Sequence, residues 1–165
     1  MHIFNTVFMG KLVCHGKFVY DNVRKWTRSI DIFAAKWLMV PIHIPTPALH
    51  WVLLVVDLYS KKFLFFDSCN GSARTYIDAM KFFMEQELLY KRKQKIPEKY
   101  WSGWREDTNP SCKQRNGYDC GVFVAMNAWC LMNNVPQCHA RQENMIRFHE
   151  YMTLSILLKK LQPVM

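Results

Sequence analysis

Four residues have the side-chain types that covalent attack on a carbonyl group requires, and they follow one another along the chain as His50, Asp67, Gln114 and Cys120. Cys120 supplies a thiol nucleophile, His50 a base that can take up its proton, and Asp67 a carboxylate that can orient the base. Gln114 precedes Cys120 on the same segment, and its side-chain amide could stabilise an oxyanion together with the backbone N–H of Cys120. The pattern therefore predicts a catalytic site formed by His50, Asp67, Cys120 and Gln114.

A predicted β-hairpin brings two of these residues together. Two β-rich runs, residues 50–58 and 63–67, flank the turn Tyr59-Ser-Lys-Lys62. His50 begins the first strand and Asp67 ends the second, so they fall within about two residues of being directly opposite. A carboxylate at that place can bond one imidazole nitrogen and thereby aim the other at a nucleophile.

Cys120 is expected at the first position of a core helix. Residues 120–133 are apolar around nearly the whole helical circumference, which predicts a helix covered on all sides. Gly117 allows a tight turn just before the helix. At a helix N-terminus the positive end of the dipole favours the thiolate form, and a neighbouring imidazolium adds to this effect.

Each residue also has a purely structural interpretation. A cysteine on a core helix is commonly an inert buried thiol. A histidine before a strand is commonly just hydrogen-bonded, and Asp67-Ser68 can be a turn or cap sequence. Taken one at a time, the structural interpretations are the stronger. The hairpin and the helix start together favour catalysis.

Composition limits the classes of protein. The 165 residues, half of them hydrophobic and 15% aromatic, predict a single domain over residues 1–165 with a sizeable core. No apolar run reaches the roughly 18 residues of a membrane span, and no signal peptide is recognisable, so we expect a soluble intracellular protein without a membrane partner. The net charge of +9 suits an acidic protein or nucleic acid. The basic run at residues 91–95 is more typical of a solvated helix end, and no nucleic-acid-binding motif is present, so nucleic acid is not predicted as a partner.

The six cysteines do not predict a metal site or disulfides. Without a secretion signal, reduced thiols are expected. No Cys-x2-4-Cys pair of the kind that binds structural zinc is present. Neither a metal nor an organic cofactor is therefore predicted.

The remaining elements give an α+β domain. Residues 3–14 and 22–26 read as short helical segments, 37–44 as a buried strand, and 45–47 as a loop. Residues 73–93 form a long amphipathic helix, 101–108 one more strand that ends at residues 109–110, and 142–161 a last helix. Helix, then sheet, then helix places the hairpin and the core helix in one domain.

Three segments of the chain resemble the SUMO-specific (sentrin) protease family. They are His50-Trp-Val-Leu-Leu-Val-Val-Asp57, Phe66-Asp67-Ser68 and Gln114-Arg-Asn-Gly-Tyr-Asp-Cys-Gly-Val-Phe123. Further matches extend from Phe4 to Phe148, so the resemblance covers essentially the whole chain. It implies a papain-like cysteine protease fold with a central mixed sheet. It also implies cleavage after the terminal Gly-Gly of SUMO-type modifiers, in deconjugation or in maturation of their precursors, by a protein of the nucleus or also of the cytoplasm. A monomer is expected.

The resemblance also implies roles for single residues. His50, Asp67 and Cys120 correspond to the catalytic triad and Gln114 to the oxyanion residue. Trp51 corresponds to a tryptophan beside the narrow tunnel that admits the Gly-Gly tail, and a flat indole there would exclude side chains. His43, Asp119 and Gly121 are expected to contact the substrate as well.

Two departures from the family pattern affect the tunnel. The family domain begins further upstream, with a Trp-Leu-Asn-Asp segment that contributes another tunnel tryptophan, so this chain is expected to be an N-terminally truncated domain. The connection before His50, residues 45–49, is longer than usual. Two alternatives therefore stay open: a protease for another modifier such as NEDD8, and a non-catalytic domain that binds a modifier.

Overall fold

A computed structural model describes residues 1–45, 49–108 and 110–160 of the chain. Its centre is a five-stranded mixed sheet with the strand order β1-β4-β5-β6-β7. The strands are β1 (His2–Ile3), β4 (Trp37–Ile44), β5 (His50–Asp57), β6 (Lys62–Phe66) and β7 (Arg105–Asp107). β4, β5 and β6 are antiparallel, whereas the edge strands β1 and β7 each run parallel to their neighbour. The predicted α+β class with a mixed sheet is confirmed.

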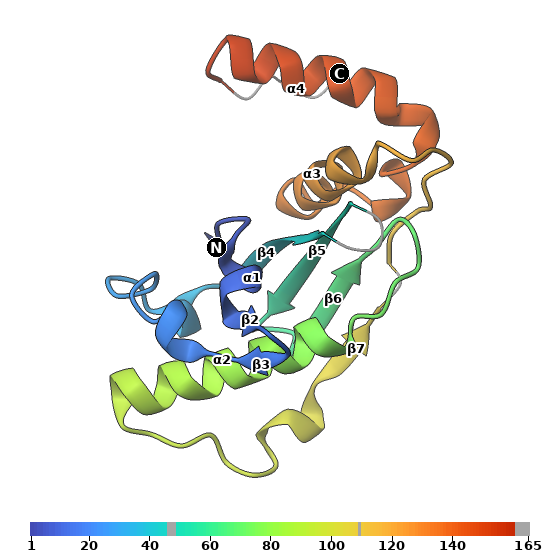
Figure 1. Cartoon of the computed structure of the whole chain (residues 1–165). Helices are drawn as coiled ribbons and strands as arrows, with labels where there is room; N and C mark the ends of the chain where they lie inside the picture. The colour runs from blue at the N-terminus through green and yellow to red at the C-terminus, as the bar shows by residue number, and fades with distance from the viewer. Residues whose placement is uncertain (46–48, 109, 161–165) are drawn as a thin grey trace.

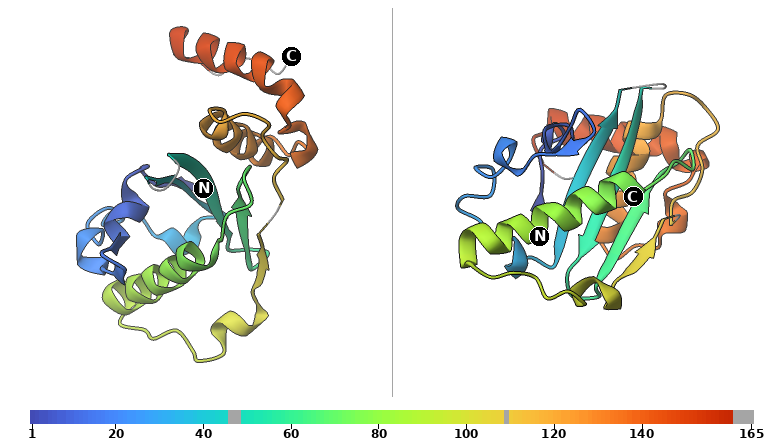
Figure 2. Two further views of the ribbon diagram at one scale, coloured as in Figure 1. Left: turned by 45° about the vertical axis from the view of Figure 1, so that its right-hand side comes forward. Right: turned by 60° about the horizontal axis from the view of Figure 1, so that its bottom comes forward.

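Helices cover both faces of the sheet (Figures 1 and 2). The short helix α1 (Phe8–Leu12) and the long helix α2 (Arg74–Arg92) lie on one face, and α3 (Cys120–Met132) lies on the other. The last helix, α4 (Met145–Leu157), packs beyond α3, on the side away from the sheet. None of the helices in the described ranges has the length and apolarity needed to cross a membrane.

The central strand β5 explains why two cores form. Residues 52–57 are all buried, because β5 lies between β4 and β6 and is covered on both faces. Side chains of a strand point alternately to opposite faces. Val52, Leu54 and Val56 accordingly pack in the cluster beneath α1 and α2. Leu53 and Val55 face α3, where they meet Val124, Ala128 and Leu131.

The hairpin of β5 and β6 has the predicted register. Leu53 pairs with Phe66 and Asp57 with Lys62. The turn is held by the Asp57 carboxylate, whose Oδ1 accepts hydrogen bonds from the backbone N–H groups of Tyr59 and Ser60 at 3.1 and 3.0 Å. β4 spans the predicted residues 37–44, and α3 has no exposed residue between 120 and 131, as expected for a core helix.

Several predicted helical segments are shorter or interrupted. The predicted helix 3–14 is α1 alone, because the chain reverses at His15 and Gly16, which have φ of 49° and 73°, and forms a small hairpin of β2 (Val13–Cys14) and β3 (Lys17–Phe18). Asn22 ends a 3₁₀ helix (Tyr20–Asn22), and residues 23–26 form turns closed by bonds such as Trp26 N–H to Val23 C=O, at 2.9 Å, instead of an α-helix.

The C-terminal half shows the same kind of difference. Residues Tyr100–Gly103 form a 3₁₀ turn, so the predicted strand 101–108 shortens to β7. Another 3₁₀ turn, Gln142–Asn144, precedes α4. The predictions for residues 46–48, 109 and 161 fall outside the described residues. In the two 3₁₀ turns, short i→i+3 hydrogen bonds replace the regular structure that periodicity had favoured.

Candidate active site

His50 and Asp67 are hydrogen-bonded at one end of the hairpin. His50 begins β5 and Asp67 follows the last residue of β6. The distance between His50 Nε2 and Asp67 Oδ1 is 2.7 Å, and the Asp67 side chain is only 2% exposed. The carboxylate thus fixes the ring, and Nδ1 is the nitrogen that remains for a reacting group.

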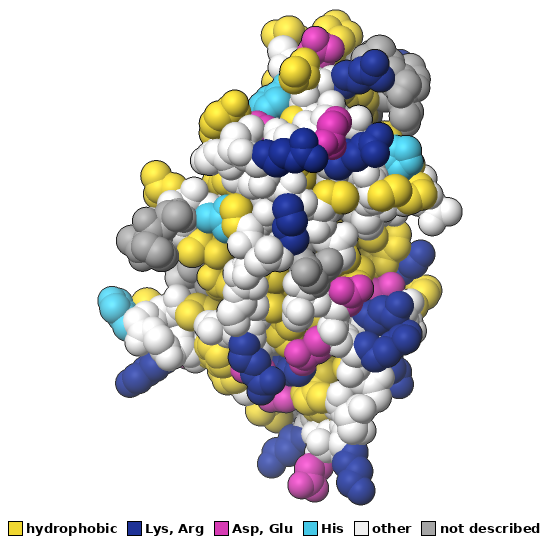
Figure 3. Space-filling model, turned by 90° about the vertical axis from the view of Figure 1, so that its right-hand side faces the viewer, with side chains coloured by type: hydrophobic (Ala, Val, Ile, Leu, Met, Phe, Trp, Pro, Cys, Tyr) yellow, Lys and Arg dark blue, Asp and Glu magenta, His cyan; other side chains and the backbone are white. Residues whose placement is uncertain are grey.

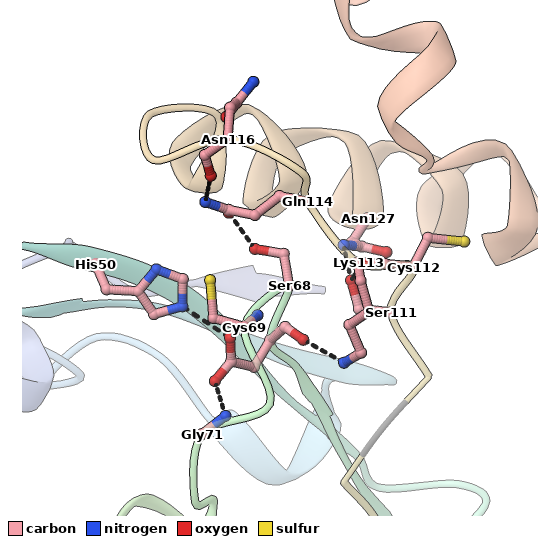
Figure 4. Close-up of polar contacts among 11 residues, drawn as sticks. His50, Ser68, Cys69, Gly71, Ser111, Cys112, Lys113, Gln114, Asn116 and Asn127 are labelled. Carbon is pink, nitrogen blue, oxygen red and sulfur yellow. Dashed lines mark hydrogen bonds and ion pairs between the residues drawn. The ribbon is translucent and has the colours of Figure 1, made fainter. Parts of the chain in front are cut away.

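The Asp67 carboxylate is itself fixed by the backbone that follows it. Oδ1 also accepts the N–H of Cys69 at 2.6 Å, and Oδ2 accepts the N–H of Gly71 at 2.5 Å. Figure 4 draws the hydrogen bonds of His50 and of the Gly71 N–H in this group as dashed lines. Charged hydrogen bonds of this kind hold the anionic carboxylate in one orientation.

The segment before α3 is tied to the same end of β6. Lys113 Nζ donates to the backbone carbonyl oxygen of Asp67 at 2.8 Å, and the N–H of Gln114 donates to the carbonyl of Ser68 at 3.2 Å. These two bonds connect residues far apart in the chain. They place the N-terminus of α3 beside the His50–Asp67 pair.

The amide of Gln114 has a defined orientation. Ser68 Oγ donates to Gln114 Oε1 at 2.6 Å, and Gln114 Nε2 donates to the carbonyl oxygen of Asn116 at 2.5 Å (Figure 4). An amide nitrogen has two N–H groups, and the bond to Asn116 uses one of them. The arrangement is compatible with a role as an oxyanion donor, which stays a prediction.

Cys120 is the first residue of α3, and its side chain is 6% exposed. The surroundings of the next residue, Gly121, indicate where Cys120 lies relative to β5. A Cβ added to Gly121 would lie 3.7 Å from Cδ1 of Trp51, which directly follows His50. The start of α3 therefore lies close to the start of β5, with room for no more than one added carbon between Gly121 and the indole. The residues proposed as nucleophile and base thus lie at the same end of β5, and their catalytic roles stay predictions.

Trp51 lies between a histidine and the start of α3. It pairs with His43 on the neighbouring strand β4, and the centroids of the two rings are 4.7 Å apart with an angle of 36°. Trp51 is half-buried and His43 is exposed. A flat aromatic wall beside the candidate nucleophile fits the predicted tail tunnel, but contact of Trp51, His43 and Gly121 with substrate remains a prediction.

Asp119, predicted to contact substrate, has a buried carboxylate with three side-chain donors. Oδ2 accepts from Asn116 Nδ2 at 2.8 Å and from Gln142 Nε2 at 2.7 Å, and Oδ1 lies 3.1 Å from His149 Nε2. Burial acts to raise the pKa of Asp119, but the hydrogen bonds from Asn116, His149 and Gln142 outweigh burial and lower it. The carboxylate joins the residue before Cys120 to the segment around α4, and its substrate contact stays a prediction.

Cys69 is a residue of this site that the sequence reasoning missed. One imidazole nitrogen of His50, one carboxylate oxygen of Asp67 and the Cys69 sulfur lie within 4.8 Å of one another. Burial and then the Asp67 charge raise the pKa of the Cys69 thiol, and the nearby Cys120 acts in the same direction. The signal in the sequence was that Cys69 lies two residues after Asp67, a predicted triad residue. Cys69 is not part of a Cys-x2-4-Cys pair, so that motif could not identify it.

Comparisons with known proteins give matches over most of the chain. A family model described as the Ulp1 protease family, C-terminal catalytic domain, matches residues 1–162. A sentrin-specific protease of Caenorhabditis elegans is 33% identical over 163 residues, covering 98% of this chain and 22% of the relative. Sentrin-specific protease 5 of Mus musculus is 31% identical over 137 residues, covering 82% of this chain and 17% of the relative. The chain thus spans about a fifth of the length of these two relatives.

A solved structure has the same fold. The C-terminal Ulp1 protease domain, in complex with Smt3, the yeast ortholog of SUMO, superposes with a TM-score of 0.74 and 25% identity. The match covers 97% of this chain and 69% of that one. The predicted papain-like arrangement, with a mixed sheet and a buried helix starting at Cys120, therefore agrees with a solved protease domain.

Proposed function

Because the chain belongs to the Ulp1 protease family, we propose that it is a cysteine protease that cleaves after the C-terminal Gly-Gly of a SUMO-type modifier. The observation that carries the proposal is the 2.7 Å hydrogen bond between His50 and a buried Asp67, beside the helix that starts at Cys120. A histidine oriented by a carboxylate and adjacent to a thiol at a helix N-terminus is the arrangement that thiol proteases require.

Acylation begins with the Cys120 thiol. His50 Nδ1 takes the thiol proton, and the sulfur attacks the carbonyl carbon of the terminal glycine. The carbonyl oxygen becomes an oxyanion, which the backbone N–H of Cys120 and the Gln114 amide stabilise. His50 then gives its proton to the departing amine nitrogen as the C–N bond breaks. The modifier is left as a thioester on Cys120.

Deacylation uses the same groups, with a water molecule as the nucleophile and the Cys120 sulfur as the leaving group. His50 removes a proton from a water molecule, whose oxygen attacks the thioester carbon, and the C–S bond breaks with return of that proton to sulfur. Asp67 stabilises the imidazolium in both steps without taking up a proton. No metal or organic cofactor enters this reaction.

Selection of the modifier tail is assigned to Trp51. An indole that lies against the start of α3 leaves little room above the tail, so glycine fits and a larger side chain is excluded. His43 stacks beside Trp51 and forms the next part of the wall. The proposed substrates are therefore polypeptide chains that end in Gly-Gly.

The positive net charge of +9 would accelerate encounter with an acidic modifier. On the face shown in Figure 3, Lys and Arg side chains lie in several separate groups with Asp and Glu among them. Such an interspersed surface favours a protein partner over the continuous basic groove of a nucleic-acid-binding protein. The Ulp1 domain solved with Smt3 is a precedent for a SUMO-type partner in a related protein.

The test is labelling by a modifier that ends in a vinyl sulfone in place of the terminal carboxylate. Wild type and Cys120→Ser are each incubated with the SUMO and NEDD8 probes, and covalent adducts are separated by size. A SUMO adduct formed by wild type and absent from Cys120→Ser supports both nucleophile and substrate class. Labelling by NEDD8 alone rejects the substrate. Binding of SUMO by folded protein that never forms an adduct favours a non-catalytic modifier-binding domain.

Cellular location and assembly belong to the same proposal. A deconjugating enzyme of this family is expected to act as a monomer in the nucleus, where its conjugates lie. Fluorescence microscopy of the tagged protein and light scattering of the purified chain test these two points. Exclusion from the nucleus, or a stable dimer, would contradict them.

A further inference from the structure

We propose that Gln142 is a positioning residue for the oxyanion hole of the proposed protease, an inference that rests on the proposed function. The two expected oxyanion donors are the Gln114 side-chain amide and the backbone N–H of Cys120. They stand at the two ends of residues 115–119, the oxyanion loop, so the conformation of this loop sets the distance between them. Gln142 lies outside the loop and is hydrogen-bonded to it at both ends.

Side chains within the oxyanion loop hold part of its shape. Asn116 Oδ1 accepts the backbone N–H groups of Tyr118 and Asp119 at 3.2 and 3.1 Å, and Asn116 Nδ2 donates to Asp119 Oδ2 at 2.8 Å. The carbonyl oxygen of Asn116 accepts from Gln114 Nε2 at 2.5 Å, so a shift of the loop would also move the Gln114 amide. These bonds join residues 114–119 to one another and do not anchor the loop to its surroundings.

The side-chain amide of Gln142 provides such an anchor. Its Oε1 accepts the backbone N–H of Arg115, the residue after Gln114, at 2.8 Å. Its Nε2 donates to Oδ2 of Asp119, the residue before Cys120, at 2.7 Å. The orientation of the amide is determined, because the backbone N–H of Arg115 can only donate and an ionised carboxylate can only accept. One side chain thus fixes both ends of the oxyanion loop.

Neighbouring contacts do not replace the two bonds of Gln142. Asp119 is only 3% exposed, so water has little access to an Oδ2 that has lost its donor. His149 Nε2 lies 3.1 Å from the other oxygen, Oδ1, and therefore does not compensate. The ion pair of Arg115 with Glu143 measures 2.7 Å but is largely exposed, and such surface pairs contribute little. Removal of the Gln142 amide should therefore let the oxyanion loop shift.

The experiment compares wild type with Gln142→Ala and Gln142→Glu. The glutamate keeps an acceptor for the Arg115 N–H but sets a carboxylate against Asp119 where the amide donor was. Asn144→Ala is the matched control, because Asn144 ends the same 3₁₀ turn and its amide donates to the His139 carbonyl oxygen at 2.8 Å rather than to the oxyanion loop. Circular dichroism checks that all four proteins are folded.

The readouts separate positioning from general stability. Cleavage of a fluorogenic SUMO substrate gives kcat and KM. Alkylation of Cys120 by iodoacetamide, followed by mass spectrometry, measures the reactivity of the thiol in a reaction that forms no oxyanion. Hydrogen exchange of the backbone N–H groups of residues 115–119 measures how firmly the oxyanion loop is held.

Both Gln142 variants should lower kcat by about 10- to 100-fold with little change in KM, because the oxyanion forms only after the substrate is bound. Their loop N–H groups should exchange faster, whereas alkylation of Cys120 should proceed at the wild-type rate. Asn144→Ala should resemble wild type in all three readouts.

Two results overturn the inference while the proposed function stands. One is cleavage by both Gln142 variants with the wild-type kcat. The other is a fall in kcat matched by an equal fall in Cys120 alkylation, which would mean that Gln142 acts on the thiol and not on the oxyanion donors. If wild type cleaves no modifier, the proposed function fails, and faster exchange in the variants would then make Gln142 a structural anchor without a part in catalysis.

Discussion

Gly71 approaches Asp67 so closely that a single methyl group on its Cα would lie 2.5 Å from the carboxylate oxygen Oδ2. The same Oδ2 accepts the Gly71 N–H at 2.5 Å. The residue at position 71 therefore has to be glycine for the carboxylate to keep its place, although no special φ angle demands it.

Replacing Gly71 by alanine should impair catalysis through displacement of Asp67. A misplacement of about 1 Å can cost on the order of 100-fold in rate. We expect Gly71→Ala to lower kcat/KM for a fluorogenic modifier substrate by about 10- to 100-fold, with kcat reduced more than KM is raised. Gly103→Ala is the control, because an added Cβ there meets nothing within 4 Å. Equal activity of Gly71→Ala and Gly103→Ala would contradict the assignment.

Asp67→Asn should leave the fold intact while removing the charge that stabilises the imidazolium. The amide also no longer selects the His50 tautomer with Nδ1 ready to accept a proton. Loss of the equivalent carboxylate in a well-studied triad costs about 10⁴-fold, so we expect a fall in kcat of roughly 10²- to 10⁴-fold. Steady-state kinetics give the rate, and circular dichroism checks folding. A loss smaller than about tenfold would mean that Asp67 is only structural.

Trp51→Ala should weaken selection of the modifier tail. Without the indole against Gly121, the channel widens and a tail with alanine in place of a glycine should enter. The expected result is a lower kcat/KM for the Gly-Gly tail, by about 10-fold or more, and a smaller ratio between Gly-Gly and Gly-Ala substrates. Parallel kinetics on the two tails measure this. If the ratio is unchanged, Trp51 is a packing residue and the tunnel lies elsewhere.

Asp119 should make stability depend on pH at the acidic end. Because the folded-state pKa of Asp119 lies below its ordinary value, its contribution is present above the ordinary pKa and is lost as pH falls through the folded pKa. At neutral pH we expect Asp119→Asn to lower the free energy of unfolding by about 1–3 kcal/mol, since three donors lose a charged acceptor. Urea unfolding of both proteins at several pH values measures the difference.

The two stability curves should converge in strong acid, where the wild-type carboxyl is itself protonated. Asp78→Asn is a suitable comparison, because the ion pair of Asp78 with Arg74 lies on the surface of α2. A surface pair of this type contributes about 0–1 kcal/mol. An Asp119→Asn protein as stable as Asp78→Asn at neutral pH would contradict the role of Asp119 as the link to His149 and Gln142.

The hairpin was the part of the site that the sequence could predict. Alternating β-rich runs around a short turn determine the register, and the register alone brings His50 near Asp67. The helix start at Cys120 was equally readable, because residues 120–131 are apolar on all sides. Both features are local consequences of periodicity.

Contacts between distant segments could not be predicted. The bond of Lys113 to the Asp67 carbonyl and that of Gln142 to Asp119 join irregular loops, for which no periodic pattern exists. Cys69 lies in a turn directly after β6, and no pattern in the sequence indicated that this turn brings it near His50. Helix propensity also favoured a helix over residues 3–14. The chain reverses at His15 and Gly16, however, and α1 ends before that reversal.

The order of the segments along the chain has a consequence for synthesis. His50 and Asp67 belong to a hairpin whose paired residues lie close together in the chain. All residues of this hairpin are synthesised before Cys120. Cys120, proposed as the nucleophile, reaches its place only when α3 packs on β5 and the segment at Lys113 and Gln114 binds to β6. These contacts join residues far apart in the chain, so the proposed nucleophile meets the proposed base through long-range packing, which is slower to form than a hairpin.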